Sequence, residues 1–164
     1  MTGTSKLADL PGGDMVGLIQ VYLRCGCRLG HSALYSHSTA LIGGKRFNAG
    51  ERLLLSVRCG SVITMVRDGR SVYGLLKKLY RVVCACDQLI DLAVVTWFPF
   101  PDYPDSDPLT VTITLNGLDV NHITETEVVP LYDIQPSRVG VEIDDEHDSM
   151  QMLRMEGTDT MPVL

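Results

Sequence analysis

The chain has 164 residues, 45% of them hydrophobic and 21% charged, a composition that excludes a wholly disordered chain and predicts one globular domain. Its five cysteines, an odd number, argue against a secreted disulfide scaffold and indicate reduced thiols in a cytoplasmic setting. The N-terminus lacks the basic and apolar regions of a signal peptide, and no apolar run is long enough to cross a bilayer. We therefore expect a protein that is not secreted, has no transmembrane segment and meets membranes only peripherally.

Charge is divided unevenly along the chain. Residues 1–99 carry 12 Lys and Arg against 6 Asp and Glu, a balance of +6, whereas residues 100–164 carry 2 against 14, a balance of −12. This polarity predicts an anionic partner for the first part and a solvated, partly flexible end for the second. Together with the glycines and proline at 11–13, it predicts a mobile N-terminal arm (1–14), a globular domain (15–143) and an acidic C-terminal tail (144–164).

The first half of the globular domain has the pattern of strands. Alternating or continuous apolar runs bounded by turn residues predict strands at about 15–25, 33–42, 52–59 and 61–67. Turns are expected at Gly43-Gly44 and at Asp68-Gly69, where glycine supplies the backbone freedom that tight connections need.

From Ser71 the apolar spacing changes. Apolar residues recur at i, i+3 and i+4 over residues 71–93, which predicts one major amphipathic helix with Ser71 as its N-cap. The four prolines between 99 and 108 then exclude regular structure.

The remainder returns to strand patterns. LTVTITL at 109–115 alternates without fault, Asn116-Gly117 predicts a turn, and VVPLYDI and SRVGVEI predict two more short strands. The expected fold is α+β: a single β-rich domain with one major amphipathic helix in the middle of the chain and an acidic flexible tail.

Two similar phrases, IQVYLRCGCRL and LLLSVRCGSVI, raise the question of metal binding. Read as strands, they direct Cys25, Cys27 and Cys59 to the apolar side, where a free thiol packs as a small hydrophobe. The alternative is a zinc-binding regulatory domain that uses Cys25, Cys27 and His31, although this spacing is not that of a standard zinc knuckle. The favoured prediction is buried thiols and no metal.

Nine basic residues are candidates for one patch that binds an anion or a membrane. They lie outside the expected apolar stripes: Arg24, Arg28, Lys45, Arg46, Arg58, Arg70, Lys77, Lys78 and Arg81. Side by side, they would suit the phosphates of lipid headgroups or of nucleic acid. Solvated charges, or charges that pair with the acidic tail, are the alternative.

WFPFP is the second candidate site, a hydrophobic finger made of Trp97, Phe98 and Phe100. The prolines between these aromatic residues keep them out of a regular strand. If the three are exposed, they suit a membrane interface or a pocket on a partner. The alternative is that one or two of them anchor the loop in the core.

No catalytic signature is present. The chain lacks a dinucleotide-binding glycine motif, a Walker phosphate loop, HExxH and a nucleophile elbow, and its four histidines have no obvious acidic partner. We therefore predict a protein that is not an enzyme and uses no cofactor.

The order of these segments resembles that of rhabdovirus matrix proteins. The resemblance rests on RLLLSVRCG, RDGRSVYGLLKKLYRVV, LTVTITLNGL and EVVPLYDIQPSRVGVEI, and covers about residues 51–143. It implies a non-enzymatic structural protein that self-associates and bridges an anionic membrane and the viral nucleocapsid in virion assembly and budding. It also implies contact with a glycoprotein cytoplasmic tail, and a location in the virion and in the host-cell cytoplasm at the inner face of the membrane. An intracellular β-rich adaptor or interaction domain is the alternative.

Overall fold

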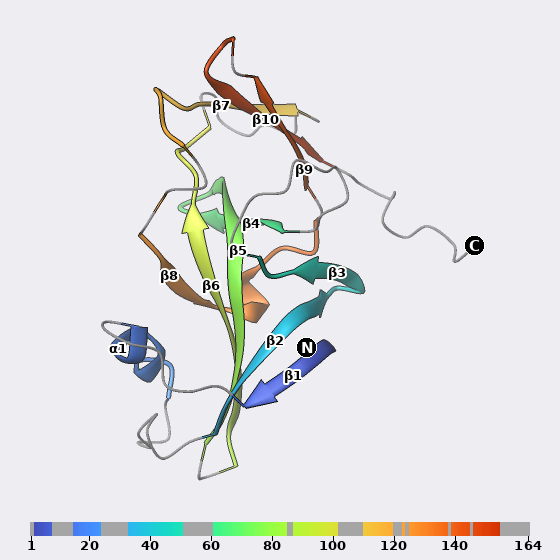
Figure 1. Ribbon diagram of the computed structural model, residues 1–164, viewed down its shortest axis with the longest axis vertical. Coiled ribbons are helices and arrows are strands. Elements are labelled where there is room, and N and C mark those ends of the chain that lie inside the picture. The colour runs from blue at the N-terminus through green and yellow to red at the C-terminus, as the bar shows by residue number, and fades with distance from the viewer. Residues whose placement is uncertain are drawn as a thin grey trace, which may run out of the picture.

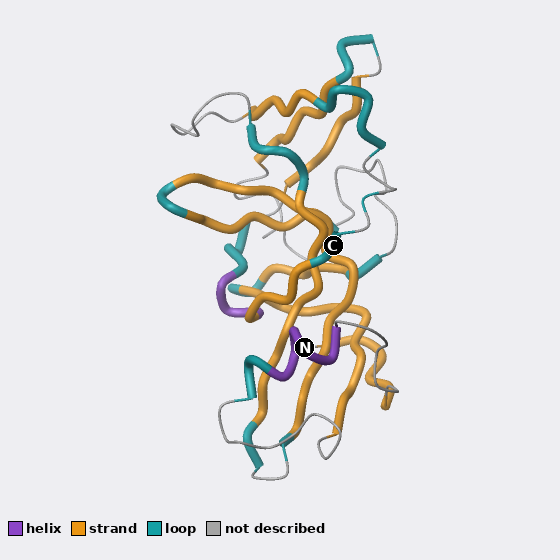
Figure 2. Tube along the Cα trace, turned by 90° about the vertical axis from the view of Figure 1, so that its left-hand side faces the viewer, coloured by secondary structure: helices purple, strands orange, loops and turns teal. Residues whose placement is uncertain are grey.

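The computed structural model describes residues 2–7, 15–23, 33–50, 61–84, 87–101, 110–119, 123, 125–137, 139–144 and 146–154. Strands dominate this part of the chain, and helix is confined to two short segments (Figure 2). Its ten strands are β1 (Thr2–Leu7), β2 (Ala33–Ile42), β3 (Lys45–Asn48), β4 (Val62–Arg67), β5 (Arg70–Val83), β6 (Leu89–Trp97), β7 (Thr110–Thr114), β8 (Glu127–Pro130), β9 (Val139–Asp144) and β10 (Ser149–Arg154). Its helices are α1 (Met15–Gln20) and the 3-10 helix η3 (Leu131–Asp133).

The strands form two antiparallel sheets. The long sheet has the order β1-β2-β5-β6-β8, with β3 paired to β2 and β4 paired to β5. The small sheet has the order β7-β10-β9. Figure 1 shows the small sheet at one end of the long strands β5 and β6, and β1 toward their other end. The molecule is therefore elongated along β5 and β6.

The predicted major helix is wrong: residues 71–83 lie in β5 and residues 89–93 in β6, so the domain is β-rich and not α+β. A β-bulge explains the error. The pairing of β5 with β6 shifts between Leu76 and Lys78, which leaves Lys77 as the extra residue. Consequently Leu76 and Leu79 share one face although they are three residues apart. Because β5 is also buried on both faces, its apolar residues imitate the spacing of a helix.

The strand expected at 15–25 is also wrong, since its described part forms α1 and a turn that ends at Leu23. Ile19 and Leu23 are both buried, and their separation of four residues suits a helix with one apolar face. The strands expected at 33–42 and 61–67 are confirmed as β2 and β4, and the one expected at 52–59 lies outside the described residues.

The predicted turns are confirmed, and each has positive φ angles. Gly43 and Gly44 (φ 58° and 82°) connect β2 to β3, and Asp68 and Gly69 (φ 51° and 76°) connect β4 to β5. Asn116-Gly117 turns the chain after β7, whose Val111 and Ile113 are buried as the alternation predicts. These turns depend only on local backbone preference, which is why the sequence predicts them.

Two segments that the sequence assigns to a mobile arm and a flexible tail contain strands. Residues 2–7 form β1, which pairs with β2, and residues 149–154 form β10, the central strand of the small sheet. Met150 and Met152 explain the second case, because they alternate with polar residues and are fully buried. The strand predicted from SRVGVEI is confirmed as β9, whereas VVPLYDI divides into β8 and η3.

Among the described residues, the buried side chains form three clusters around the long sheet. The first joins the small sheet to β4 and β5, through Val62, Tyr73, Leu75, Ile113, Val141, Met150 and Met152. The second covers the other face of β4 and β5, where Phe47, Ile63, Leu76 and Leu79 pack together. The third packs Ile19 and Leu23 against β5 and β6.

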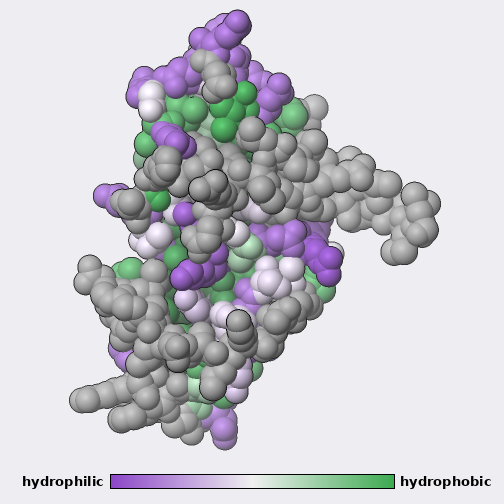
Figure 3. Space-filling model, viewed as in Figure 1, coloured by the Kyte–Doolittle hydropathy of each residue, from purple (hydrophilic) through white to green (hydrophobic). Residues whose placement is uncertain are grey.

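The surface at the far end of the small sheet is polar. In Figure 3, hydrophilic residues cover this end, with hydrophobic residues visible just below them. Among the described residues, no helix is both long and apolar enough to cross a bilayer.

Candidate functional site

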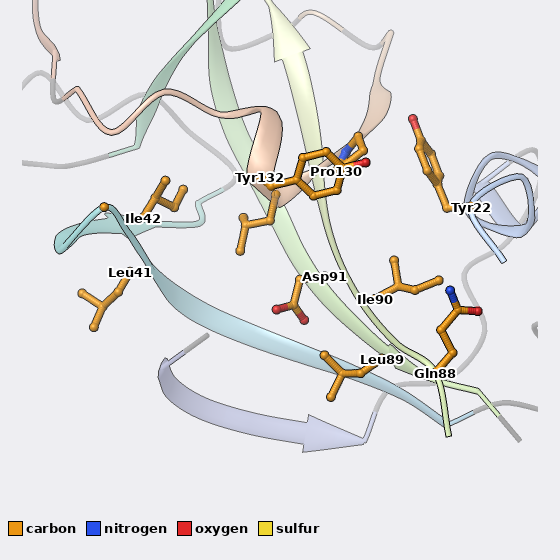
Figure 4. Close-up of a pocket in the computed structure, with 11 residues that line it drawn as sticks. Tyr22, Leu41, Ile42, Gln88, Leu89, Ile90, Asp91, Pro130 and Tyr132 are labelled. Atoms are coloured by element: carbon orange, nitrogen blue, oxygen red, sulfur yellow. The ribbon is translucent and has the colours of Figure 1, made fainter. Parts of the chain in front are cut away.

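A groove lies where β8 stops short of the start of β6. It has a volume of about 570 Å³ and is open to solvent. It is lined by Tyr22, Leu41, Ile42, Gly43, Gln88, Leu89, Ile90, Asp91, Pro130, Leu131 and Tyr132. Figure 4 shows Pro130 and Tyr132 above Asp91, Gln88 to Ile90 below them, Leu41 and Ile42 at one side and Tyr22 at the other.

The groove exists because β8 ends early. Pro130 is the last residue of β8 and lies opposite Leu92, after which the chain turns into η3. Proline cannot donate a backbone hydrogen bond, so it suits the end of an edge strand. No described strand therefore pairs with Leu89–Asp91 on the β8 side.

The groove is apolar and exposed. Three residues that line the groove are largely exposed: the exposed fraction of the residue is 51% for Leu41, 53% for Leu89 and 79% for Tyr132. Single exposed apolar residues are ordinary, but a group of them around one hollow is typical of an interaction site.

Polar groups in the groove act mainly as hydrogen-bond acceptors. The Asp91 carboxylate on β6 accepts two hydrogen bonds from Arg81 on β5. Arg81 Nε donates to Oδ1 at 2.7 Å and Arg81 Nη2 donates to Oδ2 at 2.9 Å. These hydrogen bonds raise the pKa of the Arg81 guanidinium. The side-chain carbonyl Oε1 of Gln88 is buried and has no hydrogen-bond partner among the described residues. A bound ligand with donor groups would satisfy it.

Tyr22 fixes one wall of the groove. Its Oη donates a hydrogen bond to the Val128 carbonyl at 2.7 Å, which ties the turn after α1 to β8. Burial, and next the negative charge of Glu127, raise the pKa of the Tyr22 phenol above its ordinary value. The phenol therefore stays a donor over the whole neutral range.

Of the nine basic residues, the six that the structure describes come from two strands. Arg24, Arg28 and Arg58 lie outside the described residues. Lys45 and Arg46 are on β3, and the other four are spread along β5 between residues 70 and 81, which spans roughly 35 Å at strand spacing.

The four residues on β5 also differ in the faces they share. Because of the β-bulge, the Lys78 side chain lies on the same face of β5 as Tyr80 and Val82. The Arg81 side chain lies on the opposite face, with Leu79, and forms a salt bridge with Asp91. The structure therefore separates Lys78 from Arg81, which the expected helix would have brought together.

The three aromatic residues of the expected finger have three different environments. Phe98 is buried in the first core cluster. The guanidinium of Arg67 lies over the Trp97 ring, 4.7 Å from its centroid, and the Trp97 indole donates to Glu127 at 2.6 Å. Phe100 is 63% exposed beneath Arg70. Of the expected finger, only Phe100 projects into solvent.

The proposed zinc ligands Cys25, Cys27 and His31, and the thiol Cys59, lie outside the described residues. In the described part of the chain, Asp144, Glu146 and His147 are close enough together to hold an ion. Asp144 instead binds the His147 ring at 2.6 Å, and this hydrogen bond lowers the Asp144 pKa. An exposed acidic turn of this kind is common without a metal.

Sequence reasoning missed the groove. It placed Leu89 and Asp91 in the expected helix and assigned no role to Leu41 or Tyr132. The available signal was Pro130, because proline inside a strand pattern marks an edge strand.

Comparison of the chain with protein-family models, with curated proteins and with solved structures found no match. The function therefore has to be inferred from the side chains of this chain.

Proposed function

We propose that the protein is a non-enzymatic interaction domain that holds a segment of another protein in the groove. The observation that carries this proposal is the grouping of Leu41, Leu89 and Tyr132, all at least half exposed, around one hollow of about 570 Å³. Burial of apolar surface is the main favourable contribution to most protein association, and exposed aromatic and aliphatic residues in a concave site are its usual anchors.

Selection of random 12-residue peptides displayed on phage, against the immobilised protein, tests this function. Peptides that bind the groove should bind wild type and Val66→Arg, and should lose at least about tenfold in affinity for Leu89→Arg, because the new side chain fills the groove. Val66 is the matched control, since it is 50% exposed on β4 and Leu89 is 53% exposed on β6. Selected peptides that bind Leu89→Arg as well as wild type would contradict the proposal, as would a selection that yields no binder.

A matrix role is the second function we propose, with self-association, peripheral binding to the anionic inner face of a membrane, and bridging to a nucleocapsid. The observation that favours it is the Arg70 guanidinium 5.1 Å from the centroid of the exposed Phe100 ring. A cation beside an exposed aromatic ring suits the interface of an anionic bilayer.

Sedimentation with anionic and neutral liposomes over a salt series tests the matrix role. Binding should require the anionic lipid, should weaken as salt rises, and should fall in an Arg70→Glu, Phe100→Ser variant. Lys78→Glu is the matched control for charge, because Lys78 is exposed elsewhere on β5. Equal binding to neutral liposomes, or no binding, would reject membrane contact at Phe100.

A further inference from the structure

The charge of Asp91 in the groove is already neutralised. Asp91 is the one charged residue among the described residues that line the groove, and both of its carboxylate oxygens accept hydrogen bonds from Arg81. A bound cation would have to compete with Arg81, and a bound anion would lie beside the Asp91 carboxylate. Either charge would lose its contact with water and find no free opposite charge in return, so the groove favours an uncharged occupant.

The walls of the groove are mostly apolar and aromatic. Leucine, isoleucine and proline side chains and two tyrosine rings line it, and Leu41, Leu89 and Tyr132 are at least half exposed. Its volume of about 570 Å³ has room for one bulky side chain with the main chain beside it. A large apolar side chain would cover these residues and remove their surface from water, which is favourable.

One hydrogen-bond acceptor at the edge of the groove has no partner. Gln88 directly precedes β6, and its side chain lies beside Ile90 and below Tyr22 (Figure 4). Its Oε1 is buried and receives no hydrogen bond from the described residues, which costs free energy. Gln88 as a whole is partly exposed and lines the groove, and its long side chain can change rotamer. Its oxygen can therefore turn toward a donor that enters the groove.

The tyrosine beside Gln88 does not supply this donor. The Tyr22 hydroxyl hydrogen is used in the 2.7 Å hydrogen bond to the Val128 carbonyl, which holds the turn after α1 against β8. The Tyr22 ring instead packs with Ile90 in the third core cluster, so this end of the groove offers apolar surface around an unpaired oxygen. An uncharged occupant with a large apolar surface and one donor would match it.

We infer that the groove binds the partner segment through a tryptophan side chain, whose indole N–H donates to Gln88 Oε1 and whose ring packs against Tyr22 and Ile90. This inference rests on the proposed interaction function and adds the chemistry of the partner's anchor. The indole is uncharged, has a large apolar surface and carries one donor and no acceptor. Lysine and arginine donors bring a charge, asparagine and serine offer little apolar surface, and phenylalanine has no donor.

The probe is an end-blocked peptide with one tryptophan between alanines, titrated into the isotope-labelled protein and followed by NMR. Three comparison peptides replace the tryptophan. One carries 1-methyltryptophan, which keeps the ring but loses the N–H, and should bind about three- to tenfold more weakly, the effect of one hydrogen bond. The others carry lysine or glutamate and should bind at least about tenfold more weakly, because each brings a charge and loses the ring.

Variants then place the tryptophan in the groove. Gln88→Met keeps the length of the side chain but removes the oxygen. It should weaken the tryptophan peptide about three- to tenfold and leave the 1-methyltryptophan peptide unchanged, because the two changes remove the same hydrogen bond. Leu89→Arg should weaken both peptides at least about tenfold, whereas Val66→Arg, at a position of similar exposure, should weaken neither.

The outcomes separate the anchor from the proposed function. If 1-methyltryptophan binds wild type as tightly as tryptophan, or if Gln88→Met weakens both peptides equally, the hydrogen bond to Gln88 is wrong and the inference is overturned. It is also overturned if the lysine or glutamate peptide matches the tryptophan peptide, if the tryptophan peptide does not bind, or if it binds Leu89→Arg equally. The proposed interaction function survives these results where phage selection yields a groove-binding sequence with another anchor.

Discussion

At the scale of single residues, a few contacts fix how the outer segments meet the long sheet. Tyr22 joins the turn after α1 to β8 by one hydrogen bond, and the Arg67, Trp97 and Glu127 side chains link β4, β6 and β8. Such contacts join segments far apart in sequence, and each depends on one side chain.

Tyr22→Phe should lower the free energy of unfolding by about 1 kcal/mol, the usual contribution of one hydrogen bond. The effect should also depend on pH. Because the folded-state pKa of Tyr22 is raised, its contribution is complete below the ordinary pKa of about 10 and is lost as pH rises through the folded-state pKa. Urea unfolding between pH 8 and 11 measures both effects.

Tyr132→Phe is the control, since Tyr132 is 79% exposed. An alkaline loss of stability that is equally steep in wild type and in Tyr22→Phe would show that the Tyr22 phenol is not its source.

Gly43 and Gly44 allow a second test at this scale, because both have positive φ angles but only one is crowded. A Cβ added to Gly43 would lie 2.4 Å from Pro136 Cβ, whereas one added to Gly44 would meet no atom within 4 Å. Gly44→Ala should cost about 1–2 kcal/mol of backbone strain. Gly43→Ala should cost a further 1–3 kcal/mol, roughly the penalty of overpacking. If Gly43→Ala and Gly44→Ala unfold at the same urea concentration, the contact between the β2–β3 turn and Pro136 is refuted.

At the scale of elements, the β-bulge in β5 decides which side chains reach which core. Before the bulge Val72 and Leu76 face the second cluster, and after it Leu79 does. Tyr80 and Val82 face the third cluster. If residues 76–79 formed a regular strand with no bulge, the alternation would send Leu79 to the opposite face from Leu76.

Deletion of Lys77 should therefore leave unfolding cooperative and cost no more than about 3 kcal/mol, since it removes only the extra residue and keeps every later residue of β5 on its present face. Lys77→Ala keeps the residue count and should change stability by about 0.5 kcal/mol. Far-UV circular dichroism during urea unfolding compares the two variants. Loss of cooperative unfolding in the deletion variant would mean that Lys77 is not the extra residue of the bulge.

At the scale of the whole molecule, the two sheets share a core. Met150 and Met152 of β10 pack in the same cluster as Tyr73 and Leu75 of β5. A small three-stranded sheet buries little by itself, so we expect it to unfold together with the long sheet.

Met152→Ala should lower the free energy of unfolding by about 2–5 kcal/mol through the cavity it leaves. This loss of stability should lower the urea midpoint measured by the fluorescence of Trp97, the single tryptophan, although Trp97 belongs to the other sheet. Leu118→Ala, at an exposed position after β7, serves as the control. A Trp97 transition that does not move in Met152→Ala would mean that the sheets unfold independently.

What the sequence determined by itself was local. The positive-φ turns at Gly43-Gly44 and Asp68-Gly69 depend on backbone preference, and the alternation of Val111 and Ile113 depends only on the geometry of one strand. These features were predicted correctly, as were β2 and β4.

The tertiary structure decided the rest. Residues 71–93 have an apolar spacing that fits a helix or a bulged strand buried on both faces, and only pairing with β2, β4 and β6 selects the strand. The groove depends on where β8 ends relative to β6, a relation between residues about 40 positions apart. The exposed groove residues Leu41, Leu89 and Tyr132 have side chains of the same kinds as the core. Residue type therefore does not predict their exposure, which depends on how the folded segments pack around them.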